Sequence, residues 1–208
     1  VWIVERFADL PVILPDGRMG LFGGRRHYSV FHEGYAQLCV NIAEALAGRF
    51  GNCEAVIGWH IDNEVGSYGT VDCSPPALCA FHQHLERKYG TVEELNRRWG
   101  LVFWNQEVER FDQVPAPTQM MTTRSPEHVL EYNRFCLDGM ARFILRQAEA
   151  IRRHAARRQW IVGSCTEGVS LALFRLQRER GKRLVDFVEL NNYPELLPEP
   201  LQNAMRLD

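Results

Sequence analysis

Residues 55–66 read AVIGWHIDNEVG, an apolar run that ends in three polar residues and is followed by a glycine. A short apolar run bounded by polar residues is typical of a buried parallel strand. We expect the strand over residues 55–61, with Asp62, Asn63 and Glu64 released at its C-terminal end. In a (β/α)8 barrel the C-terminal strand ends hold the chemistry, so this stretch is the first candidate for a site.

Helix and strand patterns alternate on both sides of this stretch. Before it, a loop-rich lead-in over residues 1–26 precedes a helix in which apolar residues recur at helical spacing (Tyr35, Leu38, Cys39, Ile42 and Leu46). After it, helical patterns run through residues 81–99 and from Ser125-Pro126 to Ile151, and apolar runs at 160–164 and 185–190 predict two more strands. This alternation predicts an α/β fold with a parallel sheet, open or closed.

The composition is that of an ordinary globular protein. Of the 208 residues, 46% are hydrophobic and 24% are charged, which excludes a disordered, collagenous or coiled-coil chain. The 24 basic and 26 acidic side chains leave a formal charge of -2, so no basic excess indicates nucleic acid as a partner. No continuous apolar run is long enough for a transmembrane helix, and we expect no membrane partner.

Six cysteines are spread along the chain, and none forms a Cys-x-x-Cys pair. This spacing supports neither a zinc ribbon nor a thioredoxin-type site, and six thiols are too sparse for a disulfide scaffold. We expect reduced thiols in the core of a cytoplasmic protein. Nothing in the sequence implies an organic cofactor.

The pair Asn63-Glu64 has a definite chemical use at a strand end. A carboxylic acid there can protonate a leaving oxygen, and the neighbouring amide can hold a substrate hydroxyl by a bond that strengthens in an oxocarbenium-like transition state. Taken alone, the same pair also fits a helix-capping Asn beside a surface Glu.

Three motifs in order give this pair its context. Residues 23–29 read GGRRHYS, residues 58–66 read GWHIDNEVG, and residues 88–100 read KYGTVEELNRRWG and lead into FWNQ at 103–106. In this order and spacing the chain resembles glycoside hydrolase family 42, the bacterial β-galactosidases built on a (β/α)8 TIM barrel. The resemblance extends from about residue 2 to about residue 194.

The resemblance implies roles for four residues. Glu64 matches the general acid/base of a retaining β-galactosidase, and Asn63 matches the amide that holds a sugar hydroxyl. Arg25 looks like the arginine that bonds near the acid/base and the galactose, and Trp104 looks like the loop tryptophan that lines the sugar pocket. Residues 191–194 (NNYP) resemble the end of a later strand and are a weaker candidate for substrate contact.

Each of these assignments has a structural alternative. Trp104 could fill a core position beside Phe103, and Arg25 could form an ion pair with Asp62 or Glu64, which is compatible with a role at the site. Asp62 lies two residues before Glu64, so on a regular strand both side chains would point the same way. We expect Asp62 to be a structural partner of Arg25 or Arg26, and His60 to be a hydrogen-bonded core residue.

The sequence departs from the family at a metal site. Some members hold a structural zinc with a Cys-x-Cys-x-x-Cys cluster and a fourth cysteine after the Arg-His-Tyr motif. Here the fourth position is Ser29, and the cluster region keeps only Cys73 and Cys79, six residues apart. Two thiols are not a closed tetrahedral set, so we expect no metal.

A retaining glycosidase also needs a second carboxylate as nucleophile. In the family it lies on a strand after the Asn-Tyr-Pro strand, whereas this sequence ends at Asp208, and a full barrel takes about 250 residues. We therefore expect residues 1–208 to be one partial catalytic barrel domain that lacks the first strands and the nucleophile strand, and to be inactive alone. Two alternatives remain: another β-glycosidase specificity on the same scaffold, or a non-catalytic fragment. Family members are commonly homotrimers.

Overall fold

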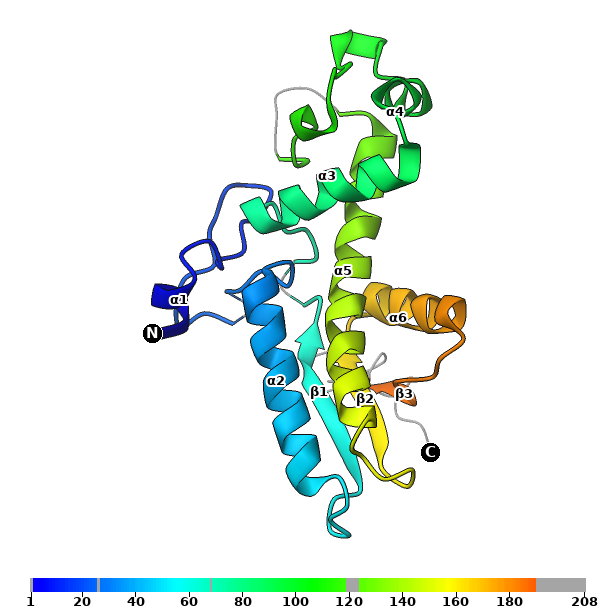
Figure 1. Cartoon of the computed structure of the whole chain (residues 1–208). Coiled ribbons are helices and arrows are strands. Elements are labelled where there is room, and N and C mark those ends of the chain that lie inside the picture. Colours follow the sequence, from blue (N-terminus) through cyan, green and yellow to red (C-terminus); the bar gives the residue numbers. More distant parts are fainter. Residues whose placement is uncertain (1, 26, 68, 119–123, 190–208) are drawn as a thin grey trace, which may run out of the picture.

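The computed structural model of the chain describes residues 2–25, 27–67, 69–118 and 124–189. Its centre is a sheet of three parallel strands in the order β1–β2–β3: β1 (Gly58–Val65), β2 (Trp160–Cys165) and β3 (Phe187–Glu189). Three helices, α2 (Glu33–Phe50), α5 (Pro126–Arg152) and α6 (Glu167–Arg180), cover one face of this sheet (Figure 1). The predicted alternation of strands and helices is therefore confirmed.

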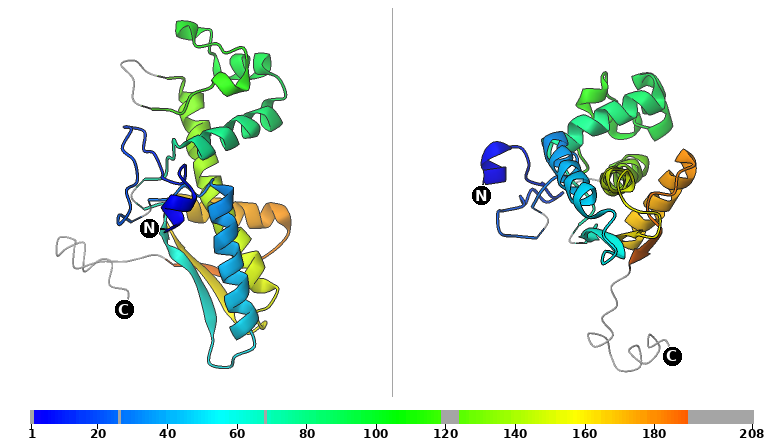
Figure 2. Two further views of the ribbon diagram at one scale, coloured as in Figure 1. Left: turned by 60° about the vertical axis from the view of Figure 1, so that its left-hand side comes forward. Right: turned by 60° about the horizontal axis from the view of Figure 1, so that its bottom comes forward.

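The opposite face of the sheet is uncovered by any described element (Figure 2). His60 on β1 and Phe187 on β3 lie on this face and are 40% and 46% exposed, in the side chain and in the whole residue respectively. A parallel sheet normally has both faces covered, as it has in a closed barrel. Among the described residues, the helices that pack on the sheet therefore all lie on one side of it.

Between β1 and α5 the chain leaves the sheet and builds a second lobe. This lobe contains α3 (Pro75–Tyr89), α4 (Val92–Trp99) and two short 3-10 turns, η1 (Phe103–Asn105) and η2 (Phe111–Gln113). It packs on the N-terminal part of α5, at the end of the molecule away from the strands (Figure 1). A five-residue helix, α1 (Trp2–Arg6), begins the lead-in that passes beside α2.

Two hydrophobic clusters hold these parts together. Under the sheet, Ile61, Val65 and Ile161 pack against Ile144 of α5 and Leu173 of α6. The second cluster joins the lobe to α5 and contains Phe81, Leu85, Leu95, Trp99, Tyr132 and Phe135. Each such fully buried side chain contributes about 1.5–3 kcal/mol, so α5 is fixed by both clusters and ties the lobe to the sheet.

The helix boundaries follow the predicted caps. Pro126 is the first residue of α5, and Gly100 ends α4 in the left-handed region at φ 62°. Only half of the predicted capping box is present, because Thr91 Oγ1 accepts the N–H of Glu94 at 3.3 Å while the Glu94 carboxylate pairs with Arg97 and Arg98. The cap still fixes the start of α4.

The first strand differs from the prediction at both ends, because it spans residues 58–65 rather than 55–61. The carbonyl oxygens of Cys53 and Val56 accept hydrogen bonds from the Gln159 side-chain amide, at 3.3 and 3.0 Å, so this segment is held by a side chain instead of a strand. The strand begins where Gly58 faces Trp160, and a Cβ there would lie 2.1 Å from the indole ring. The three polar residues are consequently inside the strand.

Candidate active site

The C-terminal end of β1 is irregular. Ile61 pairs with Gly163 and Val65 pairs with Cys165, so Asp62, Asn63 and Glu64 together lie opposite one residue of β2. This bulge changes the direction in which the polar side chains project. Bulges of this kind re-aim side chains and are over-represented next to active sites.

The backbone of the bulge is strained. Asp62 has φ 57° and Glu64 has φ 50°, in the left-handed region that residues other than glycine rarely occupy. Such a conformation costs on the order of 1 kcal/mol or more per residue and persists only where the surroundings enforce it. Two strained residues around Asn63 mark this point as a candidate site on geometry alone.

Glu64 is held from two sides. Its carboxylate Oε2 lies 3.3 Å from the Arg25 guanidinium, and its backbone N–H donates to Ser164 Oγ on β2 at 3.1 Å. The side chain is 17% exposed, which contradicts the alternative of a surface glutamate. The ion pair that was an alternative for Arg25 is present. The Arg25 side chain is itself 60% exposed.

Asp62 has a different partner from the one predicted. Its Oδ2 accepts a hydrogen bond from the Tyr28 hydroxyl at 3.0 Å, and its Oδ1 accepts the N–H of Asn63 at 2.7 Å. The prediction named Arg25 or Arg26, and its Arg25 half is wrong, because the bulge turns Asp62 toward Tyr28 and leaves Arg25 to Glu64. Arg26, the other predicted partner, lies outside the described residues.

Asn63 lies between the two strained residues and is exposed. A regular strand would point it to the same side as Ile61 and Val65, which are both buried against the helices. The bulge instead keeps its side chain out of the core, between the two strained residues.

Trp104 is not near this site in the described chain. It belongs to η1, in the lobe at the opposite end of α5 from the strands (Figure 1, green). It is 62% exposed and Phe103 is 67% exposed, so the alternative of a core position is wrong. Its φ of 62° is also left-handed, as is that of Asn105 at 54°, and this geometry presents the ring on the surface. Its role toward a sugar stays a prediction.

His60 is hydrogen-bonded, as expected, but in the described part it is not a core residue. Its Nε2 lies 2.6 Å from Glu189 Oε2, and this pair bridges β1 and β3 on the uncovered face of the sheet. Beneath the bridge, Val162 and Ser164 of β2 are almost fully buried. Ser164 and Tyr28 contact the bulge, and sequence reasoning missed both because neither lies near residues 62–64 in the chain. Residues 191–194 lie outside the described part.

The metal position predicted to be vacant contains a buried polar cluster. Ser29, Asp72 and Ser74 are each at most 2% exposed, and Asp72 Oδ1 accepts the backbone N–H of Ser74 at 2.9 Å. Burial raises the pKa of the Asp72 carboxyl. Within residues 2–25, 27–67, 69–118 and 124–189, no three His, Cys, Asp or Glu side chains are grouped as metal ligands.

None of the six cysteines forms a disulfide, and Cys53 and Cys79 are exposed rather than in the core.

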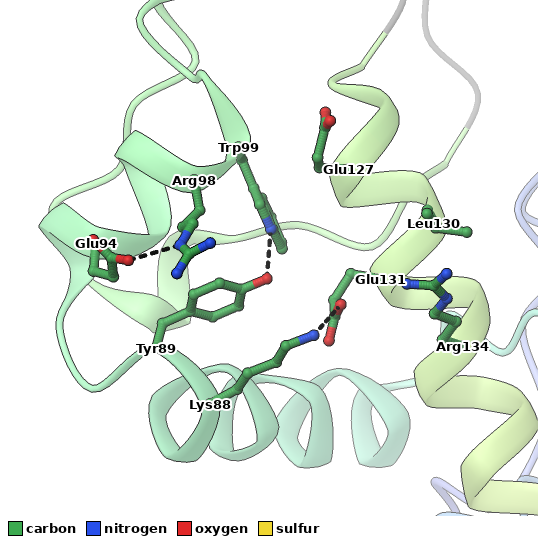
Figure 3. Close-up of a pocket in the computed structure, with 9 residues that line it drawn as sticks. All are labelled: Lys88, Tyr89, Glu94, Arg98, Trp99, Glu127, Leu130, Glu131 and Arg134. Carbon is green, nitrogen blue, oxygen red and sulfur yellow. Dashed lines mark hydrogen bonds and ion pairs between the residues drawn. The ribbon is translucent and has the colours of Figure 1, made fainter.

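A separate cavity of about 540 Å³ lies between α3, α4 and α5, and Glu64 is not among the residues that line it (Figure 3). Its central carboxylate, Glu131, is bonded by Lys88 Nζ and by His84 Nε2, each at 2.6 Å. Burial opposes ionisation of Glu131, but these two hydrogen bonds outweigh it and lower the pKa of the carboxyl. Arg98 is likewise paired with Glu94. Lys88 and Glu131, and Arg98 and Glu94, are thus paired with one another, and the cavity lies at a junction of three helices.

In the described residues no helix combines the length and the apolar character that a membrane span requires.

The model of glycoside hydrolase family 42, described as "Beta-galactosidase", matches residues 1–207. Beta-galactosidase BgaA of Thermus sp. is 34% identical over 210 residues, covering 99% of this chain and 32% of that protein. The beta-galactosidase of Thermus thermophilus gives the same identity and coverage. The chain therefore spans about a third of the length of these curated relatives.

Solved structures agree with the sequences. The crystal structure of the beta-galactosidase from the psychrophilic Marinomonas ef1 superposes with a TM-score of 0.84 at 30% identity, over 93% of this chain and 29% of that one. The beta-galactosidase of the haloarchaeon Halorubrum lacusprofundi gives a TM-score of 0.82 at 25% identity, over 93% and 28%. These neighbours are TIM barrels, so the expected fold class, a part of a (β/α)8 barrel, is confirmed.

Proposed function

Since the chain belongs to glycoside hydrolase family 42, we propose that it is the acid/base-bearing part of a retaining β-galactosidase that removes terminal β-D-galactosyl residues. The observation that carries this proposal is the strained bulge at the carboxyl end of a barrel strand. It holds the Glu64 side chain, which is 17% exposed, in an ion pair with Arg25. Strain at that position has no use in packing, whereas a proton donor needs a fixed direction.

In this proposal Glu64 donates a proton to the glycosidic oxygen as the bond to the leaving group breaks. It then removes a proton from the water that attacks the glycosyl-enzyme intermediate. Asn63 and Arg25 bond hydroxyl groups of the same sugar from either side of the carboxyl. Such bonds contribute most when they strengthen as the ring flattens in the transition state.

The nucleophile of a retaining enzyme is a second carboxylate about 5–5.5 Å from the first. We propose that it lies in a part of the barrel that these 208 residues do not include, because the chain spans 32% of the Thermus relatives. The chain is then one partial barrel domain, and the first strands and the nucleophile strand come from elsewhere.

Trp104 requires a second proposal because of its position. An exposed indole on the lobe cannot cover a sugar held at Glu64 of the same chain unless the lobe is rearranged. We propose that it covers the sugar bound by a neighbouring copy in a homo-oligomer, a trimer by family resemblance. An indole face stacks on the apolar C–H face of a pyranose.

We place the protein in the cytoplasm, where its six thiols stay reduced.

The test of the acid/base role uses the completed barrel, that is, this chain together with the residues that supply the other strands. Glu64→Gln should lower turnover of a lactose-type substrate by about 10²-fold or more, and should affect an activated nitrophenyl galactoside less, because a good leaving group needs less protonation. Asp62→Asn is the matched control, since it removes a nearby carboxylate. Equal losses on both substrates would contradict the acid role.

A substrate panel separates the alternative specificity. β-Linked arabinosides and other β-glycosides are compared with the galactoside by kcat/KM, and a preference for one of them would replace galactose while leaving the role of Glu64 unchanged.

A further inference from the structure

One short loop contacts both carboxylates of the bulge. Arg25 pairs with Glu64, and three residues later Tyr28 donates its hydroxyl hydrogen to Asp62. The two contacts differ in exposure, because Arg25 is mostly exposed while Tyr28 is half-buried. The exposed contact is placed to meet a ligand, and the half-buried contact is placed to fix the backbone.

Tyr28 is held rigidly on the helix side of the sheet. Its ring packs on Tyr35 of α2, with ring centres 4.6 Å apart, and lies 6.4 Å from Phe143 of α5. Tyr35 in turn stacks on Phe143 at an interplanar angle of 8°. The backbone of Tyr28 also forms an antiparallel β-bridge with Pro11. The hydroxyl of Tyr28 therefore has a fixed position relative to the two helices.

Asp62 uses each carboxylate oxygen for a different purpose. Oδ1 accepts the N–H of the next residue, Asn63, which stabilises the local turn, and Oδ2 accepts the Tyr28 hydroxyl from 34 residues away. Left-handed Asp residues commonly use such local side-chain bonds. The long-range bond is the one that selects the direction of Asp62, since a regular strand would point it away from the helices, opposite to Ile61.

We propose that Tyr28 is a positioning residue for Glu64. By holding Asp62 toward the helices, its hydroxyl enforces the left-handed backbone at residues 62 and 64, and this turns the Glu64 carboxyl toward Arg25. The proposal deepens the proposed function, on which its catalytic consequence rests. Its geometric content does not depend on activity.

The test compares variants of the 208-residue chain labelled with nitrogen-15. The three-bond coupling between the amide and α hydrogens reports φ, so it is measured for residues 62 and 64. Tyr28→Phe keeps the ring and removes the hydroxyl. Tyr35→Phe is the matched control, because that ring packs in the same aromatic cluster but its hydroxyl interacts with Cys39.

We expect the couplings in Tyr28→Phe to move toward those of an extended strand, while Tyr35→Phe keeps the wild-type values. Asp62→Ala should reproduce the change. Asp62→Asn should keep the wild-type couplings, because its oxygen can accept the Asn63 N–H while its NH2 group donates to the Tyr28 hydroxyl oxygen. Thermal unfolding of each variant checks that the chain is folded. Wild-type couplings in folded Tyr28→Phe would overturn the proposal.

In the completed barrel, Tyr28→Phe should lower kcat on poor leaving groups by about 10- to 10²-fold with little change in KM, because a small misplacement of a reacting group has effects of this size. If Glu64→Gln retains full activity, the proposed function fails, and the couplings still decide the positioning. If Glu64→Gln is inactive but Tyr28→Phe turns over at the wild-type rate, the positioning proposal fails alone.

Discussion

The residues at the end of β1 show how strain can be maintained by distant contacts. Glu64 is bonded through its backbone to Ser164 and through its side chain to Arg25, and Asp62 is bonded to Tyr28. Each bond of this kind contributes about 1 kcal/mol net, or more where one partner is charged. Together they offset the strain of two left-handed residues, so the bulge is stable without a glycine.

The stability of the chain should depend on pH through His128. This side chain is 4% exposed, its Nε2 lies 2.9 Å from the carbonyl oxygen of Pro115, and its ring stacks on Trp99. Burial lowers its pKa from 6.5 to about 4, and the charge of Arg124 acts in the same direction.

The unfolded chain binds a proton at His128 below pH 6.5, whereas the folded chain excludes it until about pH 4. The contribution of His128 to the free energy of unfolding is therefore fully present above pH 6.5 and is lost as the pH decreases to about 4. Below that value this group causes no further change with pH. The loss is on the order of 3 kcal/mol. Urea unfolding across this range should show the decline, and His128→Gln should flatten it. His154→Gln, on the surface, is the control, and an equal slope in both variants would contradict the assignment.

At the scale of elements, α2 presents an apolar face that the described chain does not cover. Ile42 and Leu46, which helped to predict this helix, are 62% and 47% exposed, whereas the residues it buries completely are the small Ala36 and Ala47. The helical period was thus correct, but the buried face is lined by alanines because α2 lies close to α5. In a complete (β/α)8 barrel the helices form a closed outer ring, so a neighbouring helix on the other side of α2 would cover this stripe.

This arrangement predicts effects of different size for two substitutions on one helix. Ile42→Gln should change the free energy of unfolding of the chain by no more than about 0.5 kcal/mol, because its side chain lies in water. Ala47→Gln should destabilise the chain by about 2 kcal/mol or more, because a long polar side chain has to enter a filled core. Urea unfolding of both variants measures the two changes in the free energy of unfolding. A larger effect of Ile42→Gln than of Ala47→Gln would show that α2 packs on its other face.

The elements could be predicted from the sequence because their signals are local. Pro126 and Gly100 fixed helix ends, and apolar runs located all three strands. The bulge could not be predicted, because left-handed Asp62 and Glu64 have no glycine signature and their partners lie far away in the chain. The error in the start of β1 has a similar cause, since the Gln159 side chain donates to the carbonyl groups of the expected strand start. The resemblance identified Glu64, Asn63 and Arg25, but not the contacts that hold them.

At the scale of the whole molecule, the described part is one wall of a barrel with a separate lobe. Three parallel strands carry helices on one side, and the other side, where His60 bridges to Glu189, is open. The candidate acid/base lies at the carboxyl end of this wall. The remaining strands would close the barrel around it and exclude water from the sugar, which strengthens every electrostatic contact in the site.

We predict from this architecture that the purified 208-residue chain does not hydrolyse a nitrophenyl β-galactoside. Glu64 can supply a proton, but an activated aryl leaving group hardly needs one, so the rate on this substrate depends on the nucleophile. The proposal assigns that nucleophile to residues outside the chain, which spans 32% of its Thermus relatives. The assay compares the wild type with Glu64→Gln at equal concentration. Turnover by the wild type that the variant loses would mean that the chain carries, alone or as an assembly of its own copies, a complete pair of carboxylates.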